Sequence, residues 1–171
     1  MKNNKIFLSQ EDITVMEVDA IVNAANTSLE GGGGVDGMIH QAAGIELDKA
    51  CRLLNGCVTG DAKITKGFNL PAKYIIHTVG PIWNNGTRNE EALLASSYKR
   101  CMEVAIENQC KTIAFPNIST GIYHFPKELA AKIAVDTIIQ YLSNDISIEK
   151  VFFVCYSKEN YKIYKKLLDN L

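Results

Sequence analysis

Two carboxamides, a glycine run and a carboxylate lie close together near the start of the chain, and their spacing suits chemistry on an anionic ligand. Asn23 and Asn26 follow the apolar segment 20–22, four consecutive glycines fill positions 31–34, and Asp36 stands two residues after them. Glycines add no side chains to a core and lose more conformational entropy on folding than other residues. Their amides, presented just before a helix, would attract an anion such as phosphate. We therefore predict that this stretch holds a phosphorylated ligand and acts on it.

A second loop rich in potential hydrogen-bond donors follows an apolar segment at residues 112–115. It covers residues 117–125, with the sequence NISTGIYHF. In open α/β sheets, ligands bind beyond the carboxyl ends of the strands. Because residues 23–37 and 117–125 both follow predicted strands, we expect the two loops to face each other across one edge of the sheet.

Alternating strands and helices are expected to position these loops. The hydrophobic pattern predicts strands at 5–8, 20–22, 61–65, 74–79, 112–115 and 151–156, and helices at 37–55 with a break at Gly44, 90–108, 126–141 and 157–171. In the first helix, apolar residues such as Ile39, Ile45 and Leu53 recur at helical spacing. Several strands are uniformly apolar, as is typical of strands covered on both faces. The sequence therefore predicts an α/β protein, with a three-layer α/β/α fold and a mixed, largely parallel central sheet.

The length and composition are those of one soluble domain that spans residues 1–171. The chain is 47% hydrophobic and 22% charged, and its net charge is −1. These proportions are ordinary for a globular protein with a full core. A nearly neutral chain has no bulk electrostatic attraction for nucleic acid, so local donors would have to bind a nucleotide-sized anion. No stretch has the pattern of a signal peptide or a membrane span, and we expect a cytoplasmic protein.

Cysteine and histidine usage does not favour a metal site. The five cysteines are an odd number without a Cys-x-x-Cys pair, which disfavours a disulfide framework and a closed zinc site. A set made of Cys51, Cys57 and either His40 or His77 is conceivable but disfavoured, and no metal is predicted. His77 lies inside an apolar strand and is expected to be a core histidine with satisfied hydrogen bonds.

Residues 32–37 match the dinucleotide-binding pattern G-x-G-x-x-G, but their context does not fit it. A polar octet, 23–30, separates them from the preceding strand, whereas the glycine turn of a Rossmann fold follows its strand directly. The expected second strand with a terminal acidic residue is also missing, since residues 44–55 have helical spacing. A dinucleotide-dependent oxidoreductase is therefore disfavoured.

Five motifs taken together resemble the macrodomain family, in particular its MacroD-type members. They are DIT at 12–14, VNAAN at 22–26, GGGGVDG at 31–37, IIHTVGP at 75–81 and STGIY at 119–123. The resemblance extends from the first motif to the last helix. It implies an ADP-ribose pocket and hydrolysis of mono-ADP-ribose from protein carboxylates and of O-acetyl-ADP-ribose, with no cofactor. The implied partners are ADP-ribose, O-acetyl-ADP-ribose and mono-ADP-ribosylated proteins.

The resemblance assigns the adenine end of the pocket to three residues. Asp12 resembles the family's adenine reader, whose carboxylate accepts from the exocyclic amine, and the Ile13 amide would serve a ring nitrogen. Tyr156 resembles the aromatic residue that stacks on adenine. The alternatives are a solvated turn for Asp12 and packing at the rim of the core for Tyr156. Glu11 stands where the family usually has glycine, which puts the shape of the adenine rim in question.

The same resemblance assigns the pyrophosphate to backbone amides of both loops. The residues are Gly33, Gly34 and Val35 in the first loop and Ser119, Thr120, Gly121, Ile122 and Tyr123 in the second. Tyr123 would also cover the distal ribose. The alternative is that the second loop is an ordinary entry to a helix. His124 replaces the family's usual glycine; if this position has a positive φ, it is mildly strained, although histidine tolerates that conformation better than most residues.

Asn23, Asn26, Asp36 and His40 resemble the family's catalytic residues. Asn26 would orient the distal ribose hydroxyls, and Asp36 would position and polarise the attacking water. Asn23 is expected to brace the loop rather than to touch the substrate. His40, one helical turn after Asp36, either supports it or merely packs. For Asp36 the alternative is a carboxylate placed at a helix start by the helix dipole alone.

A single carboxylate at the reacting end limits the leaving group. Cleavage of a glycosidic bond commonly uses two carboxylates, but Asp12 belongs to the adenine end and leaves only Asp36. A carboxylate leaving group, with a conjugate-acid pKa of about 4, departs without a proton, whereas an arginine guanidine or a serine alkoxide does not. We therefore expect Asp/Glu-linked ADP-ribose and O-acetyl-ADP-ribose as substrates. A non-catalytic reader of ADP-ribose and a phosphatase acting on ADP-ribose 1″-phosphate are the alternatives.

Overall fold

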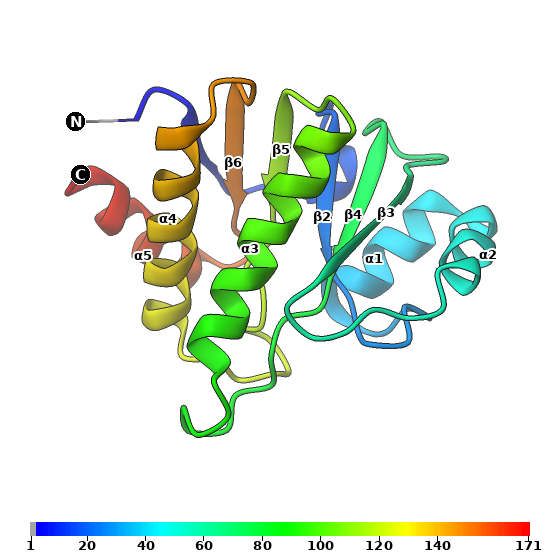
Figure 1. Ribbon diagram of the computed structural model, residues 1–171, viewed down its shortest axis with the longest axis horizontal. Helices are drawn as coiled ribbons and strands as arrows, with labels where there is room; N and C mark the ends of the chain where they lie inside the picture. Colours follow the sequence, from blue (N-terminus) through cyan, green and yellow to red (C-terminus); the bar gives the residue numbers. More distant parts are fainter. Residues whose placement is uncertain (1–2) are drawn as a thin grey trace.

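The computed structural model describes residues 3–171 (Figure 1). Its elements in chain order are β1 (Ile6–Ser9), the 3₁₀ turn η1 (Ile13–Val15), β2 (Ala20–Ala24), α1 (Gly34–Ala43), α2 (Ile45–Leu53), β3 (Ala62–Lys66), β4 (Tyr74–Thr78), α3 (Glu90–Glu107), β5 (Thr112–Phe115), α4 (Lys127–Asn144), β6 (Lys150–Val154) and α5 (Lys158–Asp169). Each predicted strand and helix has a counterpart among them. The first two residues of the predicted domain lie outside the described part.

The six strands form one mixed sheet in the order β1-β6-β5-β2-β4-β3. Neighbouring strands run parallel, except that β3 is antiparallel to β4. This arrangement confirms the predicted mixed, largely parallel sheet. Because all strands but β3 run the same way, their carboxyl ends meet at one edge, and the loops that follow them gather there.

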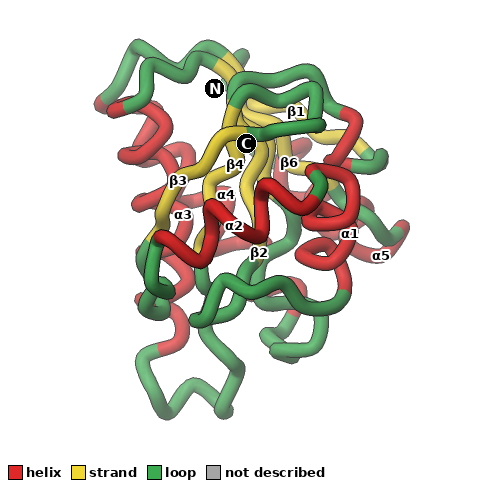
Figure 2. The backbone as a smooth tube through the Cα atoms, turned by 90° about the vertical axis from the view of Figure 1, so that its right-hand side faces the viewer, coloured by secondary structure: helices red, strands yellow, loops and turns green. Residues whose placement is uncertain are grey.

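Helices cover both faces of the sheet and give the structure three layers (Figures 1 and 2). On one face, α3, α4 and α5 bury the larger core, which includes Tyr98 and Tyr164. On the other face, α1, α2 and η1 bury a smaller core, which includes Ile39 and Leu47. The strands between these cores are apolar on both faces because both faces are covered.

The predicted helix at 37–55 is two helices, α1 and α2, that point in different directions. The helix breaks at Gly44 as predicted, with a φ of 94°, a conformation that favours glycine. Ile45 and Leu53 are 68% and 83% exposed, whereas Leu47 and Cys51 are buried. Ile45 and Leu53 therefore do not continue the buried face of Ile39, because the turn redirects α2 and a helical spacing defines one face only within one straight helix.

The last strand also ends earlier than predicted. β6 stops at Val154, so Cys155 and Tyr156 belong to the connection to α5. The chain turns here because Ser157 caps α5, accepting a hydrogen bond from the Asn160 amide at 3.1 Å. Tyr156 is thereby released from the sheet.

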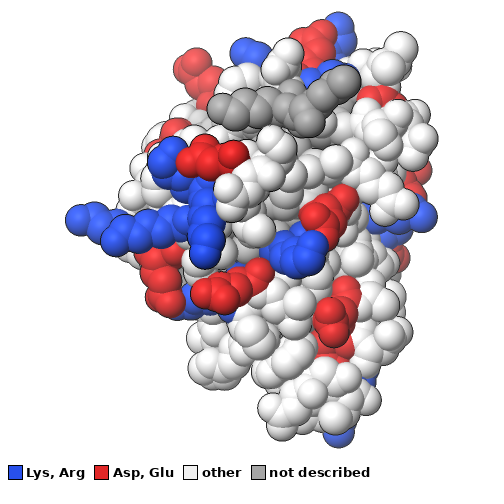
Figure 3. All heavy atoms as spheres, turned by 90° about the vertical axis from the view of Figure 1, so that its left-hand side faces the viewer, with Lys and Arg blue, Asp and Glu red and all other residues white. Residues whose placement is uncertain are grey.

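Charged side chains of both signs are interspersed on the side of the molecule that carries α4 and α5 (Figure 3). Ion pairs within and between these helices include Lys132–Asp136 and Lys127–Glu159. The mixture agrees with the net charge of −1. Among residues 3–171, no helix combines the length and apolar character needed to cross a bilayer.

Candidate functional site

A cavity of about 540 Å³ opens at the carboxyl ends of the parallel strands, a size typical of small-molecule sites. Segments that follow several different strands line it: residues 11–13 after β1, 24–26 and 32–36 after β2, Gly80 after β4, 116–123 after β5, and Tyr156, Ser157 and Asn160 after β6. The glycine-rich first loop and the second loop therefore face each other across one site, as predicted from their positions after strands.

The glycine run ends where α1 begins. Gly33 precedes the helix and supplies no side-chain cap, so the first amides of α1 remain available to a ligand. A Cβ added at Gly33 would meet no atom within 4 Å. Gly34 has a φ of 58°, which also favours glycine. Gly33, Gly34 and Val35 all line the cavity, where an anion could reach their backbone.

Asp36 lies in the first turn of α1, and its carboxylate is held from two sides. Oδ1 accepts a hydrogen bond from Nδ2 of Asn23 at 2.8 Å, and Nε2 of His40 lies 3.3 Å from the same oxygen. Burial by itself would raise the pKa of Asp36, but the contacts with His40 and Asn23 outweigh burial and lower the pKa. Asp36 is therefore an ionised hydrogen-bond acceptor at neutral pH, which suits a group that orients a water molecule.

His40 lies between two carboxylates. Its Nε2 contacts Asp36, and its Nδ1 lies 2.7 Å from Oδ1 of Asp48. Asp36 raises the pKa of His40, and Asp48 adds to this effect against the opposing effect of burial. The ring N–H is not aligned on Asp36, so this contact is an ion pair rather than a hydrogen bond. Of the two roles left open for His40, this geometry favours support of Asp36.

The second oxygen of Asp36 faces a gap beside Asn26. A Cβ added at Gly32 would lie 3.4 Å from Oδ2 of Asp36 and 3.7 Å from Nδ2 of Asn26. Oδ1 of Asn26 accepts from the Ser28 hydroxyl at 2.9 Å, so the amide nitrogen of Asn26 points away from Ser28 and toward Gly32. The missing side chain of Gly32 thus leaves room between an acceptor and a donor, where one water molecule can bridge them.

The second loop is held in shape by backbone contacts. The Phe125 amide donates to the Ser119 carbonyl at 2.9 Å, and the Trp83 amide donates to the Tyr123 carbonyl at 2.9 Å. Gly80 packs directly against the loop, because a Cβ added there would lie only 2.1 Å from Oγ of Ser119. The shape of the loop therefore depends on the segment that follows β4.

Replacing His124 by glycine is expected to stabilise the protein. His124 has a φ of 57°, which is the positive φ that makes a residue other than glycine strained at this position. The left-handed conformation costs a non-glycine residue on the order of 1 kcal/mol. Relief of this strain should raise Tm by about 2–4 °C in scanning calorimetry. Asn85→Gly is the control, because Asn85 has a φ of 56° but asparagine tolerates it better. A His124→Gly variant that melts no higher than the wild type would contradict the strain argument.

On the β1–β6 side of the cavity, Asp12 caps the turn η1. Its Oδ1 accepts from the Thr14 amide at 2.9 Å and from the Thr14 hydroxyl at 2.6 Å. Glu11, Asp12, Ile13 and Tyr156 line the cavity together. Tyr156 is 82% exposed, which disagrees with packing at the rim of the core and leaves its ring available for stacking.

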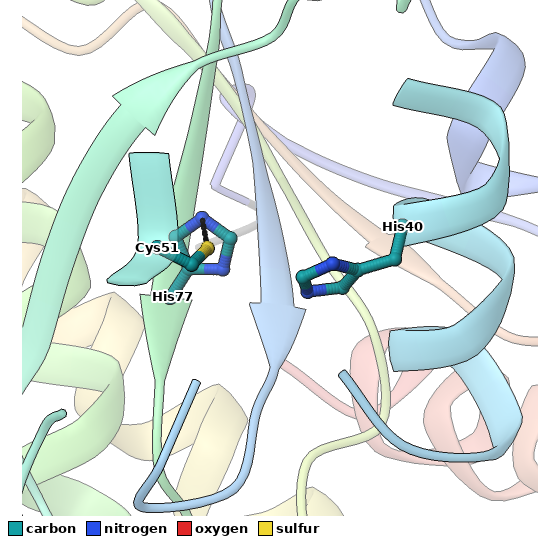
Figure 4. Close-up of side chains that lie close together, drawn as sticks. All are labelled: His40, Cys51 and His77. Atoms are coloured by element: carbon teal, nitrogen blue, oxygen red, sulfur yellow. Dashed lines mark hydrogen bonds between the residues drawn. The ribbon is translucent and has the colours of Figure 1, made fainter. Parts of the chain in front are cut away.

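A cluster next to Asp36 joins the partly buried His40 with the buried Cys51 and His77 (Figure 4). One possible ligand atom from each lies within 4.8 Å of the others, a spacing within reach of a metal ion. Both ring nitrogens of His77 already have partners, since Nδ1 lies 3.1 Å from Nδ2 of Asn23 and Nε2 lies 3.0 Å from Oγ1 of Thr65. Burial raises the pKa of the Cys51 thiol to about 11. The cluster therefore fits a hydrogen-bonded core histidine, as predicted for His77, better than a metal centre.

The fold and the cavity define an α/β protein with a site between two loops at the carboxyl ends of parallel strands. The family model of the Macro domain matches residues 22–134. The chain belongs to the macrodomain family, which confirms the resemblance seen in its motifs.

Relatives and solved structures agree with this family. A macro domain-containing protein of Chlorobaculum tepidum is 57% identical over 97% of this chain and 96% of its own length. O-acetyl-ADP-ribose deacetylase 1 of Pantoea vagans is 51% identical over 96% of this chain and 99% of its own length. A point mutant of the Oceanobacillus iheyensis macrodomain, solved with ADPR (ADP-ribose), superposes with a TM-score of 0.91 at 45% identity, covering 95% of this chain and 91% of that chain.

The structure brings most of the predicted site residues to the cavity. Those that line it are Asp12, Ile13, Asn26, Gly33, Gly34, Val35, Asp36, Ser119, Thr120, Gly121, Ile122, Tyr123 and Tyr156. Asn23 and His40 do not line the cavity and reach it only through Asp36. Lys127 and Asn160 also line it, but the sequence did not single them out, and Gly32 was recognised only as part of the glycine run. Lys127 and Asn160 could have been found from the sequence, because each lies in the first turn of a predicted helix that directly follows a loop of the cavity.

Proposed function

We propose that this macrodomain binds ADP-ribose in the cavity and hydrolyses its carboxylate esters, releasing mono-ADP-ribose from Asp and Glu side chains and acetate from O-acetyl-ADP-ribose. The deacetylase name of the Pantoea relative and the neighbour solved with ADPR support this proposal. The observation that carries it is the ionised Asp36, whose second oxygen faces the Asn26 amide across the gap at Gly32.

In the proposed reaction, backbone amides of both loops hold the pyrophosphate and leave the distal ribose beside Asp36. Where the carboxylate is attached at C1″, as in an Asp or Glu ester or a 1″-O-acetyl group, the C1″–O bond breaks through an oxocarbenium-like transition state, and the carboxylate keeps the bonding electron pair. A water held by Asp36 and Asn26 adds to C1″ and gives its proton to Asp36 or to solvent. The leaving carboxylate has a conjugate-acid pKa of about 4 and needs no proton, so one protein carboxylate is sufficient.

A comparison of leaving groups tests this function. The protein is incubated with target proteins carrying ADP-ribose on Glu, Ser or Arg, and free ADP-ribose is measured. Release is expected from the Glu-linked target, because only that leaving group departs unprotonated. Equal rates on all three would contradict the leaving-group argument. Binding of ADP-ribose in calorimetry without release would make the protein a reader, and release of inorganic phosphate from ADP-ribose 1″-phosphate alone would make it a phosphatase.

Two substitutions of Asp12 distinguish its role in capping η1 from its proposed role in binding adenine. Asparagine caps a turn about as well as aspartate, so Asp12→Asn should leave Tm unchanged while it weakens ADP-ribose binding by roughly tenfold through loss of a charged acceptor. Asp12→Ala should lose about 0.5–2 kcal/mol of stability in addition. Thermal unfolding and calorimetric titration measure the two effects. Wild-type affinity in Asp12→Asn would remove Asp12 from the adenine site.

A further inference from the structure

We propose that His77 is a positioning residue for this reaction: together with Thr65, it fixes the orientation of the Asn23 amide, which in turn aims Asp36. The catalytic consequence rests on the proposed function. His77 does not line the cavity, so it would act only through Asn23 and not by contact with the substrate.

The sheet places Asn23 and His77 side by side. The two residues are paired in register on the neighbouring parallel strands β2 and β4, so their side chains leave the sheet on the same face. Both are 0% exposed. Figure 4 shows His77 on β4 and His40 on α1, with Cys51 of α2 against the His77 ring. The imidazole is thus enclosed within the layer that carries Asp36.

One arrangement of hydrogens satisfies the chain of contacts from Thr65 to Asp36. The Thr65 hydroxyl donates its hydrogen to the Lys66 carbonyl at 3.1 Å, so its oxygen accepts from Nε2 of His77 at 3.0 Å. With this hydrogen on Nε2, Nδ1 of His77 is an acceptor for Nδ2 of Asn23 at 3.1 Å. The other hydrogen of Nδ2 goes to Oδ1 of Asp36 at 2.8 Å.

The opposite arrangements are unfavourable. Turning the Asn23 amide over would place its oxygen against the Asp36 carboxylate, and a hydrogen on Nδ1 of His77 would point at the Asn23 amide nitrogen. In the observed orientation, Oδ1 of Asn23 is buried without a hydrogen-bond partner among the described residues. The oxygen of the Asn23 side chain therefore does not help to hold the amide. The orientation of the amide depends on the two groups that accept its hydrogens, His77 and Asp36.

The surrounding groups favour the neutral form of His77. Burial, together with the charge of His40, lowers the pKa of His77 to about 4 against the opposing effect of Asp36. From α2, Asp48 faces His40, and the thiol of Cys51 lies with its Sγ 3.8 Å from Nε2 of His77. The neutral imidazole keeps its acceptor directed at Asn23 while Asp36 is ionised.

The test replaces Thr65, whose hydroxyl oxygen fixes the tautomer of His77 without contacting Asp36. Thr65→Val removes the acceptor for Nε2–H at nearly constant shape, and we expect kcat to fall by between about 10-fold and 100-fold with ADP-ribose affinity unchanged. Asn23 would then stabilise the Asp36 charge less, so the pKa of Asp36 should rise and the acid limb of the kcat profile should move to higher pH. Thr65→Ser keeps the hydroxyl and should restore both quantities. An unchanged kcat and acid limb in Thr65→Val would overturn the proposal.

A second measurement does not depend on turnover. Nitrogen-15 chemical shifts of the wild-type protein should show His77 protonated on Nε2 and bare on Nδ1 from about pH 5 to pH 8. A hydrogen on Nδ1 would overturn the proposal, even if Thr65→Val proved too unstable to assay. If the wild type released no ADP-ribose, the proposed function would fail, while these shifts and the pKa of Asp36 in Thr65→Val would still decide the role of His77.

Discussion

Asp36→Ala is expected to lower the rate of ADP-ribose release by on the order of 10²-fold or more, the usual scale for losing one general base. The variant loses the oxygen that faces Asn26 across the gap at Gly32, so the water is no longer oriented. The second loop keeps its shape because its backbone contacts do not involve Asp36. ADP-ribose affinity should therefore change by less than about tenfold. Single-turnover release from a Glu-linked target and calorimetric titration measure the two quantities.

Two further variants separate the charge of Asp36 from its surroundings. Asp36→Asn keeps the shape but removes the negative charge, and it should be nearly as slow as Asp36→Ala. Asp48→Asn leaves Asp36 in place and removes only the outer carboxylate on His40, so its effect should be much smaller. An Asp36→Ala protein with wild-type turnover would rule out the role assigned to this carboxylate.

Gly32→Ala is expected to lower kcat by about tenfold or more without loss of stability, because the added methyl group occupies the place of the water. Its Cβ would lie 3.4 Å from Oδ2 of Asp36 and 3.7 Å from Nδ2 of Asn26, both ordinary contacts, and the φ of Gly32 lies outside the left-handed region. The fold can therefore accept alanine. Steady-state kinetics on O-acetyl-ADP-ribose and a thermal melt check this expectation.

Gly33→Ala is the matched control for this substitution. A Cβ at Gly33 would meet no protein atom within 4 Å and would face the cavity, so this variant should also fold normally. It should weaken ADP-ribose binding, because the methyl group approaches the pyrophosphate rather than the water. Equal kcat in Gly32→Ala and wild type would show that the attacking water does not sit at Gly32.

Those parts of the site that are close in sequence could be predicted, since local patterns are enough to place them. Asn26, the glycine run and Asp36 all fall between a strand and a helix, and the alternation of elements puts that connection at the carboxyl edge of the sheet. The supports of Asp36 could not be predicted in the same way. Asn23 contacts His77, 54 residues later, only because β2 and β4 are neighbours, and hydrophobic spacing does not specify the order of strands.

The cysteines show the same limit at short range. From the sequence, a set of Cys51, Cys57 and a histidine is disfavoured but possible. Gly56, with a φ of 79°, turns the backbone between them, and the thiol of Cys57 donates to the Val58 carbonyl instead. Cys51 alone joins the two histidines. Nearness in the sequence therefore does not show which cysteine lies beside the histidines.

The tethering of the second loop bears on how a ligand enters. The carbonyls of Ser119 and Tyr123 accept hydrogen bonds from the amides of Phe125 and Trp83, and the Gly80 backbone packs closely against Ser119. A loop that its own contacts already hold in shape loses little binding free energy to ordering when a ligand binds. Association with ADP-ribose should accordingly proceed in a single kinetic phase whose rate rises linearly with ligand concentration, limited by encounter rather than by loop closure.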